Sequence, residues 1–413
     1  MRPELLAQIC NSRPKNFMSH IGRSRIVRCA PLAILVAAAS GISGCIGHVA
    51  LDRAVIDYDT TTAQSISKQL LLNVARARYN QPMHFTAISS IAATYRFSTS
   101  AGTGAAQAGS NGHVLVPLLN AAAEENPTIS IAPMQGEEFT QRLLTPFQEQ
   151  KLTLLLRQGY DVDSLLRLLG AEVRLDGDML VHHNRPSDHE GYIVYRKVMS
   201  HLSTIQDRHA LYVDPLHFDH TWTVPAASVT PETFAATYKD FSVTCGKEQC
   251  VVSKRVNGRV MITNYDPSVL SNDERIRLHA EAEEAPPNDI LVDIRAGYVG
   301  GEYPMHGRLR LRSFHEVLNF IGRGMAEEPE FDVPPDPRTP EMTENPAHTL
   351  EISESDGAPT GDELSVELHG HHYRVRADNG YQWNRKAFSL LYQLFQMSVS
   401  TVEAAGPAIT ISK

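Results

Sequence analysis

The amino-terminal segment constrains this chain more than any other feature of its sequence. A stretch rich in Lys and Arg is followed by an uncharged, mostly apolar run at residues 29–51, within which small residues lead into Cys45. A basic region, a short apolar region and small residues before a cleavage point are typical of a secretory signal. We therefore predict that residues 1–44 are removed and that the fold is built from the rest of the chain outside the cytoplasm.

The residues around Cys45 resemble a lipobox, the processing signal of bacterial lipoproteins. Ile42, Ser43 and Gly44 precede the cysteine, and Ile46 follows it. The resemblance implies that the Cys45 thiol carries a lipid anchor of diacylglycerol and palmitate, which attaches the protein to a membrane. Because Asp is missing directly after the cysteine, the resemblance also implies the periplasmic face of the outer membrane.

Two alternatives stay open at this end of the chain. Residues 29–51 are nominally long enough to cross a bilayer as an uncleaved helix, although Pro31 and three glycines interrupt them. Translation starting at Met18 would give a signal of more conventional length.

Charge is divided unevenly between the predicted signal and the remainder. The whole chain has a net charge of −9, but residues 1–44 contain six Lys or Arg and one acid, so the remainder carries −14. An acidic body lacks the clustered cations that displace counterions from nucleic acid, so no nucleic-acid partner is expected. With 42% hydrophobic and 21% charged residues, the composition excludes a disordered, collagen-like or disulfide-dense chain.

Two cysteines, Cys245 and Cys250, remain beyond the lipid-bearing one. An isolated pair in an oxidising compartment is typical of a disulfide that closes a small loop. A metal site is the alternative, but it would need His or carboxylate partners as well. We predict the disulfide.

Hydrophobic periodicity predicts an α+β protein, with a helix-rich region and a small antiparallel sheet at 45–270. Its first helix, 62–79, has Asn73 in the middle of an apolar stripe, where the amide is predicted to bond the backbone of the next strand. The Asn-Gly pair at 257–258 lies between two β-type runs and predicts a hairpin turn. Residues 98–112 are rich in Gly, Ala and Ser, which predicts a flexible loop.

The segment 271–289 is charged and ends in two prolines, so we predict a linker there. Beyond it, residues 290–413 follow the order β-α-β-β-α-β, which is typical of a ferredoxin-like sheet whose last strand is expected at 407–411. Residues 326–362 interrupt this order and are rich in prolines and acids, which predicts an extended, solvated loop.

Histidines supply the candidates for a metal site. His217, Asp219 and His220 offer imidazole and carboxylate together, and His369 and His371 would point to one face of a strand. Neither set completes a known metal-binding pattern, so we assign no metal. The sequence has no nucleophile elbow, and we predict neither a cofactor nor a particular enzyme class.

Three cations are candidates for binding an anionic group. Arg385 and Lys386 lie in the first turn of the last long helix, where the helix dipole disfavours positive charge, and Arg76 lies on the first helix. Internal acids such as Glu316 or an external anionic ligand would each explain these cations.

Four stretches resemble a family of uncharacterised lipoproteins from Gram-negative bacteria. They are QLLLNVARARYN (69–80), PTISIAPMQGEEFTQRLLTP (127–146), RLRLRSFHEVLNFIG (308–322) and NRKAFSLLYQLFQ (384–396). The resemblance implies a shared fold and a location in the cell envelope, and it implies no activity.

The sequence therefore favours a lipid-anchored envelope protein with a structural or partner-binding role. The lipobox, the acidic loops and the lack of a catalytic constellation support this interpretation. An envelope hydrolase acting on cell-wall or polysaccharide material, with or without a metal, is the alternative. A binder of small anionic ligands is a third hypothesis.

Overall fold

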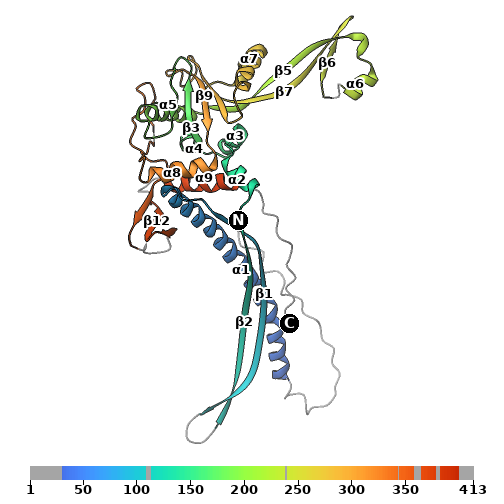
Figure 1. The fold of residues 1–413 in the computed structure, drawn as a ribbon. Coiled ribbons are helices and arrows are strands. Elements are labelled where there is room, and N and C mark those ends of the chain that lie inside the picture. Colours follow the sequence, from blue (N-terminus) through green and yellow to red (C-terminus); the bar gives the residue numbers. More distant parts are fainter. Residues whose placement is uncertain are drawn as a thin grey trace. The chain divides into compact units, whose positions relative to one another are not determined.

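The computed structural model describes residues 30–107, 113–237, 240–342, 344–357, 364–377 and 382–399. The chain divides into two compact units, residues 1–63 and 64–413. Helix α1 (Ala30–Arg78) provides the described part of the first unit, and the second unit contains every later element (Figure 1). The predicted α+β class is confirmed, including a helical N-terminal part with a small antiparallel sheet.

The other helices and the strands have the following bounds. The helices are α2 (Glu137–Leu144), α3 (Glu149–Arg157), α4 (Val162–Leu169), α5 (His189–Asp207), α6 (Pro231–Thr237), α7 (Asn272–Glu283), α8 (Phe314–Gly324) and α9 (Trp383–Ser398). The strands are β1 (Phe85–Gln107), β2 (His113–Met134), β3 (Gly170–Leu175), β4 (His182–His183), β5 (Tyr212–Pro225), β6 (Ser242–Cys245), β7 (Gln249–Thr263), β8 (Asp289–Ile294), β9 (Met305–Leu311), β10 (Ile352–Ser355), β11 (Ser365–Leu368) and β12 (His371–Val375).

A seven-stranded sheet organises the second unit. Its order is β4-β3-β9-β8-β7-β5, and β6 pairs with β7 outside this path. The β7–β8 pair is parallel, whereas the other pairs are antiparallel. Every residue of β8 is buried, which is expected of a strand covered on both faces.

The two faces of β8 pack into different cores. Ile290 and Val292 join the main core, which includes apolar side chains of α4, α5, α8 and α9. Leu291 joins a smaller core that includes Leu278 and Ala282 of α7. The sheet is therefore a central layer with a thick helical layer on one face and α7 on the other.

The first helix anchors the strand that follows it. Asn73 donates to the His84 carbonyl oxygen over 2.8 Å and accepts from the His84 amide over 2.8 Å. Gln69 makes the same pair of bonds with Thr86, over 3.1 and 2.7 Å. The structural role predicted for Asn73 is confirmed.

Residues 271–289 are not a linker. They contain α7, which starts in a capping box between Ser271 and Glu274 and buries Leu278 against the sheet. Strands from both sides of the predicted boundary share the seven-stranded sheet, so the chain is not divided there. The prediction failed because α7 has a narrow apolar stripe among many charged residues.

The predicted ferredoxin-like sheet is also corrected. The expected elements exist as β8, α8, β11, β12 and α9, but β8 lies in the seven-stranded sheet while β10, β12 and β11 form a separate one. The prediction did not include β9. This strand pairs with β8, where a ferredoxin-like sheet would have paired β8 with a later C-terminal strand. The strand expected at 407–411 lies outside the described residues.

The described part of the predicted loop 326–362 is extended, but it is packed rather than solvated, and it contains β10. Val333 is 2% exposed, and Asn345 accepts hydrogen bonds from both Arg167 and Arg196. These two guanidinium groups are buried on α4 and α5, so they need acceptors inside the protein. The segment supplies acceptors for both arginines. Composition alone predicted a solvated loop because it does not show that buried arginines elsewhere in the chain need these acceptors.

The Asn-Gly pair at 257–258 does not turn the chain, because β7 continues through it. Gly258 and Arg259 together oppose Leu216 of β5, which makes a β-bulge. A Cβ atom on Gly258 would lie 2.8 Å from the His279 ring of α7, so the glycine permits close packing of this helix.

Residues 98–107, predicted as part of a flexible loop, belong to β1. They pair with residues 113–122 of β2 in an unbroken antiparallel register. Ladder hydrogen bonds use the backbone alone, so a Gly- and Ala-rich composition does not prevent them. Residues 108–112 lie outside the described part.

Candidate functional site

The face of the sheet that carries α7 is lined with charged side chains. In β9, buried and half-buried residues alternate, so that His306, Arg308 and Arg310 share this face. Arg310 bonds Asp289 of β8 over 2.8 Å and lies 3.1 Å from Glu172 of β3. The charges of β9 are therefore matched by acids on both neighbouring strands.

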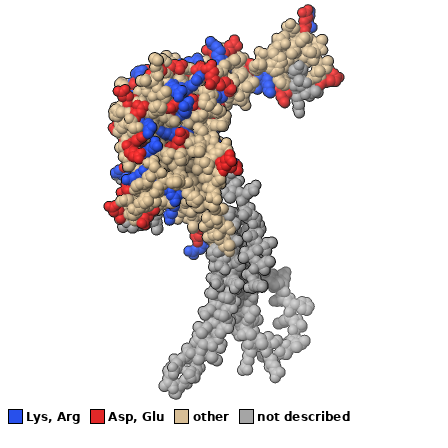
Figure 2. Space-filling view, viewed as in Figure 1, with Lys and Arg blue, Asp and Glu red and all other residues tan. Residues whose placement is uncertain are grey.

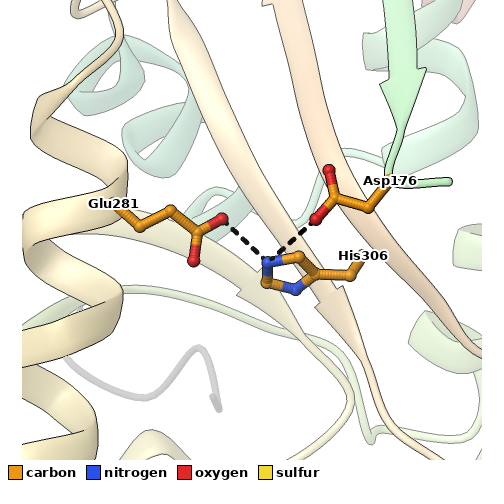
Figure 3. Close-up of side chains that lie close together, drawn as sticks. All are labelled: Asp176, Glu281 and His306. Atoms are coloured by element: carbon orange, nitrogen blue, oxygen red, sulfur yellow. Dashed lines mark hydrogen bonds and ion pairs between the residues drawn. The ribbon is translucent and has the colours of Figure 1, made fainter. Parts of the chain in front are cut away.

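A histidine–carboxylate cluster lies at one end of this row (Figure 3). His306 directly opposes Asp293 in the β8–β9 pair, and its Nδ1 lies 3.1 Å from Asp293 Oδ1. Its Nε2 lies 2.8 Å from Glu281 Oε1 of α7 and 3.7 Å from Asp176 Oδ2, just beyond β3. We call Asp176, Glu281, Asp293 and His306 the His306 cluster.

Close approach of β3 to β9 positions Asp176. Its amide donates to the His306 carbonyl oxygen over 2.8 Å. A Cβ atom on Gly307 would lie 2.1 Å from the Arg174 carbonyl oxygen, so only glycine permits this spacing. The local sequence thus brings an exposed carboxylate beside the imidazole.

Asp293 is the buried member of the cluster, with 5% of its surface exposed. It also accepts a hydrogen bond from the Tyr265 hydroxyl over 2.5 Å and one from Arg295 Nε over 2.8 Å. Burial alone would raise the pKa of Asp293, but the bonds from His306 and Tyr265 and the charge of Arg295 outweigh it and hold the pKa below its ordinary value.

The imidazole responds in the opposite direction. The hydrogen bond to Asp293, opposed by partial burial and reinforced by Glu281, raises the pKa of His306 to about 9. The buried carboxylate orients the ring, so that Nε2 faces the half-buried Glu281 and the exposed Asp176. The arrangement can hold a proton or a metal ion at Nε2.

The sequence did not indicate this cluster. Its members come from the end of β3, from α7, β8 and β9, and neither α7 nor β9 was predicted. Alternation of Leu and Arg before residue 312 was the one available signal, because it is typical of a strand with a charged face.

The predicted metal candidates lie elsewhere. His217 is on β5, where its Nδ1 lies 2.8 Å from Asn257 Oδ1, and the His220 ring contacts Trp222. The backbone amide of Asp219 donates to the Asn272 side chain over 2.7 Å. Within the described residues, this set does not form a group of three close ligands.

The second histidine set is equally dispersed. His369 lies in the turn before β12 and shares a hydrogen bond with Gln81. His371 Nδ1 lies 2.8 Å from Asp356 and 3.8 Å from Glu354. No metal-sized group of three ligands joins His369 and His371 in the part of the chain that the structure describes.

The three candidate anion-binding cations do not converge either. Arg76 bonds the Asn73 side chain and the His84 carbonyl oxygen. Arg385 lines a cavity of about 580 Å³, whereas Lys386 lines another, of about 290 Å³, that also contains Asp161. These cations therefore belong to separate surroundings.

The predicted disulfide between Cys245 and Cys250 is confirmed. It joins β6 to β7 at the end of a projection that we call the arm, residues 217–257. β7 pairs with β8 only at Met261–Thr263, so in the arm β7 pairs with β5 and the short β6 alone.

The strand β5 forms the edge of the arm. It has β7 on one side and, among the described residues, no strand on the other. Val251 of β7 is 48% exposed and Phe234 of α6 is 41% exposed. We call the described residues of the second unit outside the arm the body. Figure 2 shows many charged side chains on the body, whereas those on the visible side of the arm lie mainly near its base and its tip.

Cys45, the predicted lipid-bearing residue, lies within α1 in the first unit. None of the helices among the described residues combines the length and the apolar character needed to cross a membrane. No family model, no curated protein and no solved structure matches the chain.

Proposed function

We propose that this protein is a lipoprotein of the Gram-negative envelope that binds a partner protein through its arm. In this proposal, the signal at 1–44 is removed and Cys45 carries the lipid that holds the protein on the periplasmic face of the outer membrane. The Cys245–Cys250 disulfide supports export, because such bonds persist in oxidising compartments.

The observation that carries the partner-binding role is the outer edge of β5 in the arm, which pairs with no strand among the described residues. The Asn272 side chain already bonds the backbone amide and carbonyl group of Asp219, so an added strand would pair with β5 between His220 and Val224, a stretch without proline. A ribbon of two long strands is only marginally stable alone, and the disulfide and β6 reinforce this one. The partner we infer is a protein with an extended segment that pairs with β5.

The membrane anchor is tested with Cys45→Ser. The variant is expected to lose acyl labelling and to leave the membrane fraction, while wild-type protein stays with the outer membrane. Continued acylation of the variant would contradict the assignment of Cys45.

The arm is tested by replacing exposed apolar residues. Val251→Asp is expected to reduce recovery of one reproducible cross-linked partner at least about tenfold, because it buries a charge in the new contact. Leu154→Asp is the matched control, since Leu154 is 53% exposed but lies on α3 of the body. Equal losses in both variants, or none in either, would refute binding through the arm.

A second candidate is a metal-dependent hydrolase of envelope material. The His306 cluster is the observation that favours it, because it places an imidazole and two accessible carboxylates together. Hydrolysis by this route requires the His306 cluster to hold a metal ion.

A further inference from the structure

We propose that Asp176, Glu281 and His306 bind one divalent transition-metal ion, of which Zn²⁺ is the representative, on the α7 face of the sheet. This site is independent of partner binding through the arm. The three side chains each offer one ligand atom, and these atoms all lie within 4.8 Å of one another. Imidazole with carboxylates is a ligand set that Zn²⁺ accepts.

The distances fit a small ion. Zn²⁺ binds nitrogen and oxygen at about 2.0–2.2 Å, so neighbouring ligands of a tetrahedral site lie about 3.4 Å apart. His306 Nε2 is 2.8 Å from Glu281 Oε1 and 3.7 Å from Asp176 Oδ2, which brackets this spacing. Small side-chain rotations would therefore admit the ion without movement of the backbone.

Asp293 supplies the support that a histidine ligand requires. A metal-binding histidine usually bonds a carboxylate or carbonyl group through its other ring nitrogen, which fixes the ring and the tautomer. Asp293 Oδ1 lies 3.1 Å from His306 Nδ1, and Tyr265 and Arg295 hold the other oxygen. Nε2 is thereby left for the metal.

The local charge favours a divalent cation. When a metal ion replaces the proton at Nε2, the three carboxylates of Asp176, Glu281 and Asp293 surround a neutral imidazole, and Arg295 compensates one of them. Glu274 lies near Arg295, and Arg308 lies 3.4 Å from Glu284, so these groups do not remove the excess. In that state two negative charges remain for the ion to neutralise.

The scaffold holds the ligands in place before any ion arrives. His306 is paired within the sheet, and the Glu281 carbonyl oxygen accepts a hydrogen bond from Arg308 of β9 over 2.9 Å. Asp176 is 70% exposed at its side chain, so the site opens to solvent. Three protein ligands leave a position for water or a substrate group, as in catalytic zinc sites.

A protonated His306 that pairs with the same carboxylates is the competing explanation of these contacts. The two explanations differ in the role of Asp176, because a metal needs its carboxylate as a ligand. Within the described residues, that carboxylate forms its one ion pair with His306, at 3.7 Å, which is long for an ion pair built for stability.

The experiment measures Zn²⁺ binding to the purified full chain after chelator treatment, by calorimetry and by metal analysis after dialysis. We expect the wild type to bind one equivalent of Zn²⁺. In Asp176→Asn and in Glu281→Gln the affinity for Zn²⁺ should fall at least about 100-fold, since even residues that only support a ligand contribute 10–100-fold to affinity. Glu283→Gln is the control, because Glu283 lies on the same helix and is exposed.

Both ligand variants change exposed or half-exposed side chains, and thermal unfolding verifies that they fold. The proposal is wrong if the wild type binds no Zn²⁺, or if Asp176→Asn still binds Zn²⁺ as tightly as the wild type does. Binding of Ca²⁺ in preference to Zn²⁺ would likewise overturn the assignment to a transition metal, because Ca²⁺ prefers oxygen ligands alone.

Discussion

The strand β7 passes through two regions that differ in burial and in the strands beside them, although it pairs with β5 in both. From Arg259 to Thr263 it lies inside the seven-stranded sheet, where all five residues are buried. From Gln249 to Asn257 it belongs to the arm, where it lacks β8 as a neighbour and where Val251 is half exposed. The strands and helices that flank β7 therefore determine which of its segments is buried and which is exposed.

The β-bulge at Gly258 and Arg259 marks the change between the two regions. Arg259 turns inward, where it bonds Glu149 over 2.7 Å and donates to four backbone carbonyl groups, those of Ala282, Ala285, Pro286 and Asp289. Arg259 thereby connects the base of the arm to α3, to the end of α7 and to the segment that leads from α7 into β8. Arg255, four residues earlier, is exposed on the arm.

The largest expected effect is a loss of stability on substitution of Arg259, and substitution of Arg255 is its control. Arg259→Leu should lower the free energy of unfolding by about 3–5 kcal/mol, because it leaves Glu149 buried without its partner. Arg255→Leu should change it by no more than about 0.5 kcal/mol. Urea denaturation of both variants measures the difference, and similar losses would show that the arm is part of the same rigid core.

Removal of the disulfide should have a smaller and more local effect. Closing so short a loop contributes about 2 kcal/mol in the chain-entropy model. After Cys245→Ser and Cys250→Ser together, hydrogen exchange should speed up in β6 and in residues 249–257, but not in β8. Faster exchange throughout the sheet would contradict the separation between arm and body.

The smallest expected effect is a gradual loss of stability on acidification that originates in the body. His201 on α5 is fully buried, with its ring nitrogens bonded to Gly300 and Thr339. Burial lowers its pKa below the ordinary 6.5, an effect that the Gly300 bond and the charges of Glu302 and Asp336 oppose and Arg208 reinforces.

The direction of this pH dependence follows from proton linkage. The unfolded chain takes up the His201 proton at a higher pH than the folded protein does, so the contribution is complete above pH 6.5 and declines as the pH falls through the folded-state pKa. His201→Asn should be less stable near neutral pH and lose less on acidification. An identical slope in wild type and variant would exclude His201 as the cause.

The sequence predicted the parts of the fold that local patterns determine. The helices α8 and α9 occur in the predicted order β-α-β-β-α-β, and Arg385 and Lys386 lie in the first turn of α9 as expected, because both helices have an apolar stripe. Asn73 and the Cys245–Cys250 pair were predicted correctly because each acts on a nearby segment.

The parts that depend on distant neighbours were not predictable. The order of the sheet brings β3 beside β9, and with them Asp176 beside His306, which is 130 positions later. The same order places β5 at an edge of the sheet. The residues around 257–258, which were expected to form a hairpin turn, instead continue β7 along β5 into the arm. Neither fact has a local signature, because both follow from pairings between separate segments.

The most direct test of partner binding is site-specific photo-cross-linking in living cells. A cross-linker at Thr223, an exposed residue of the β5 edge, is compared with one at Leu154 on the body. The account predicts one dominant adduct with an envelope protein from position 223 and none of that size from position 154. Adducts of equal intensity from both positions, or no adduct at 223, would contradict it.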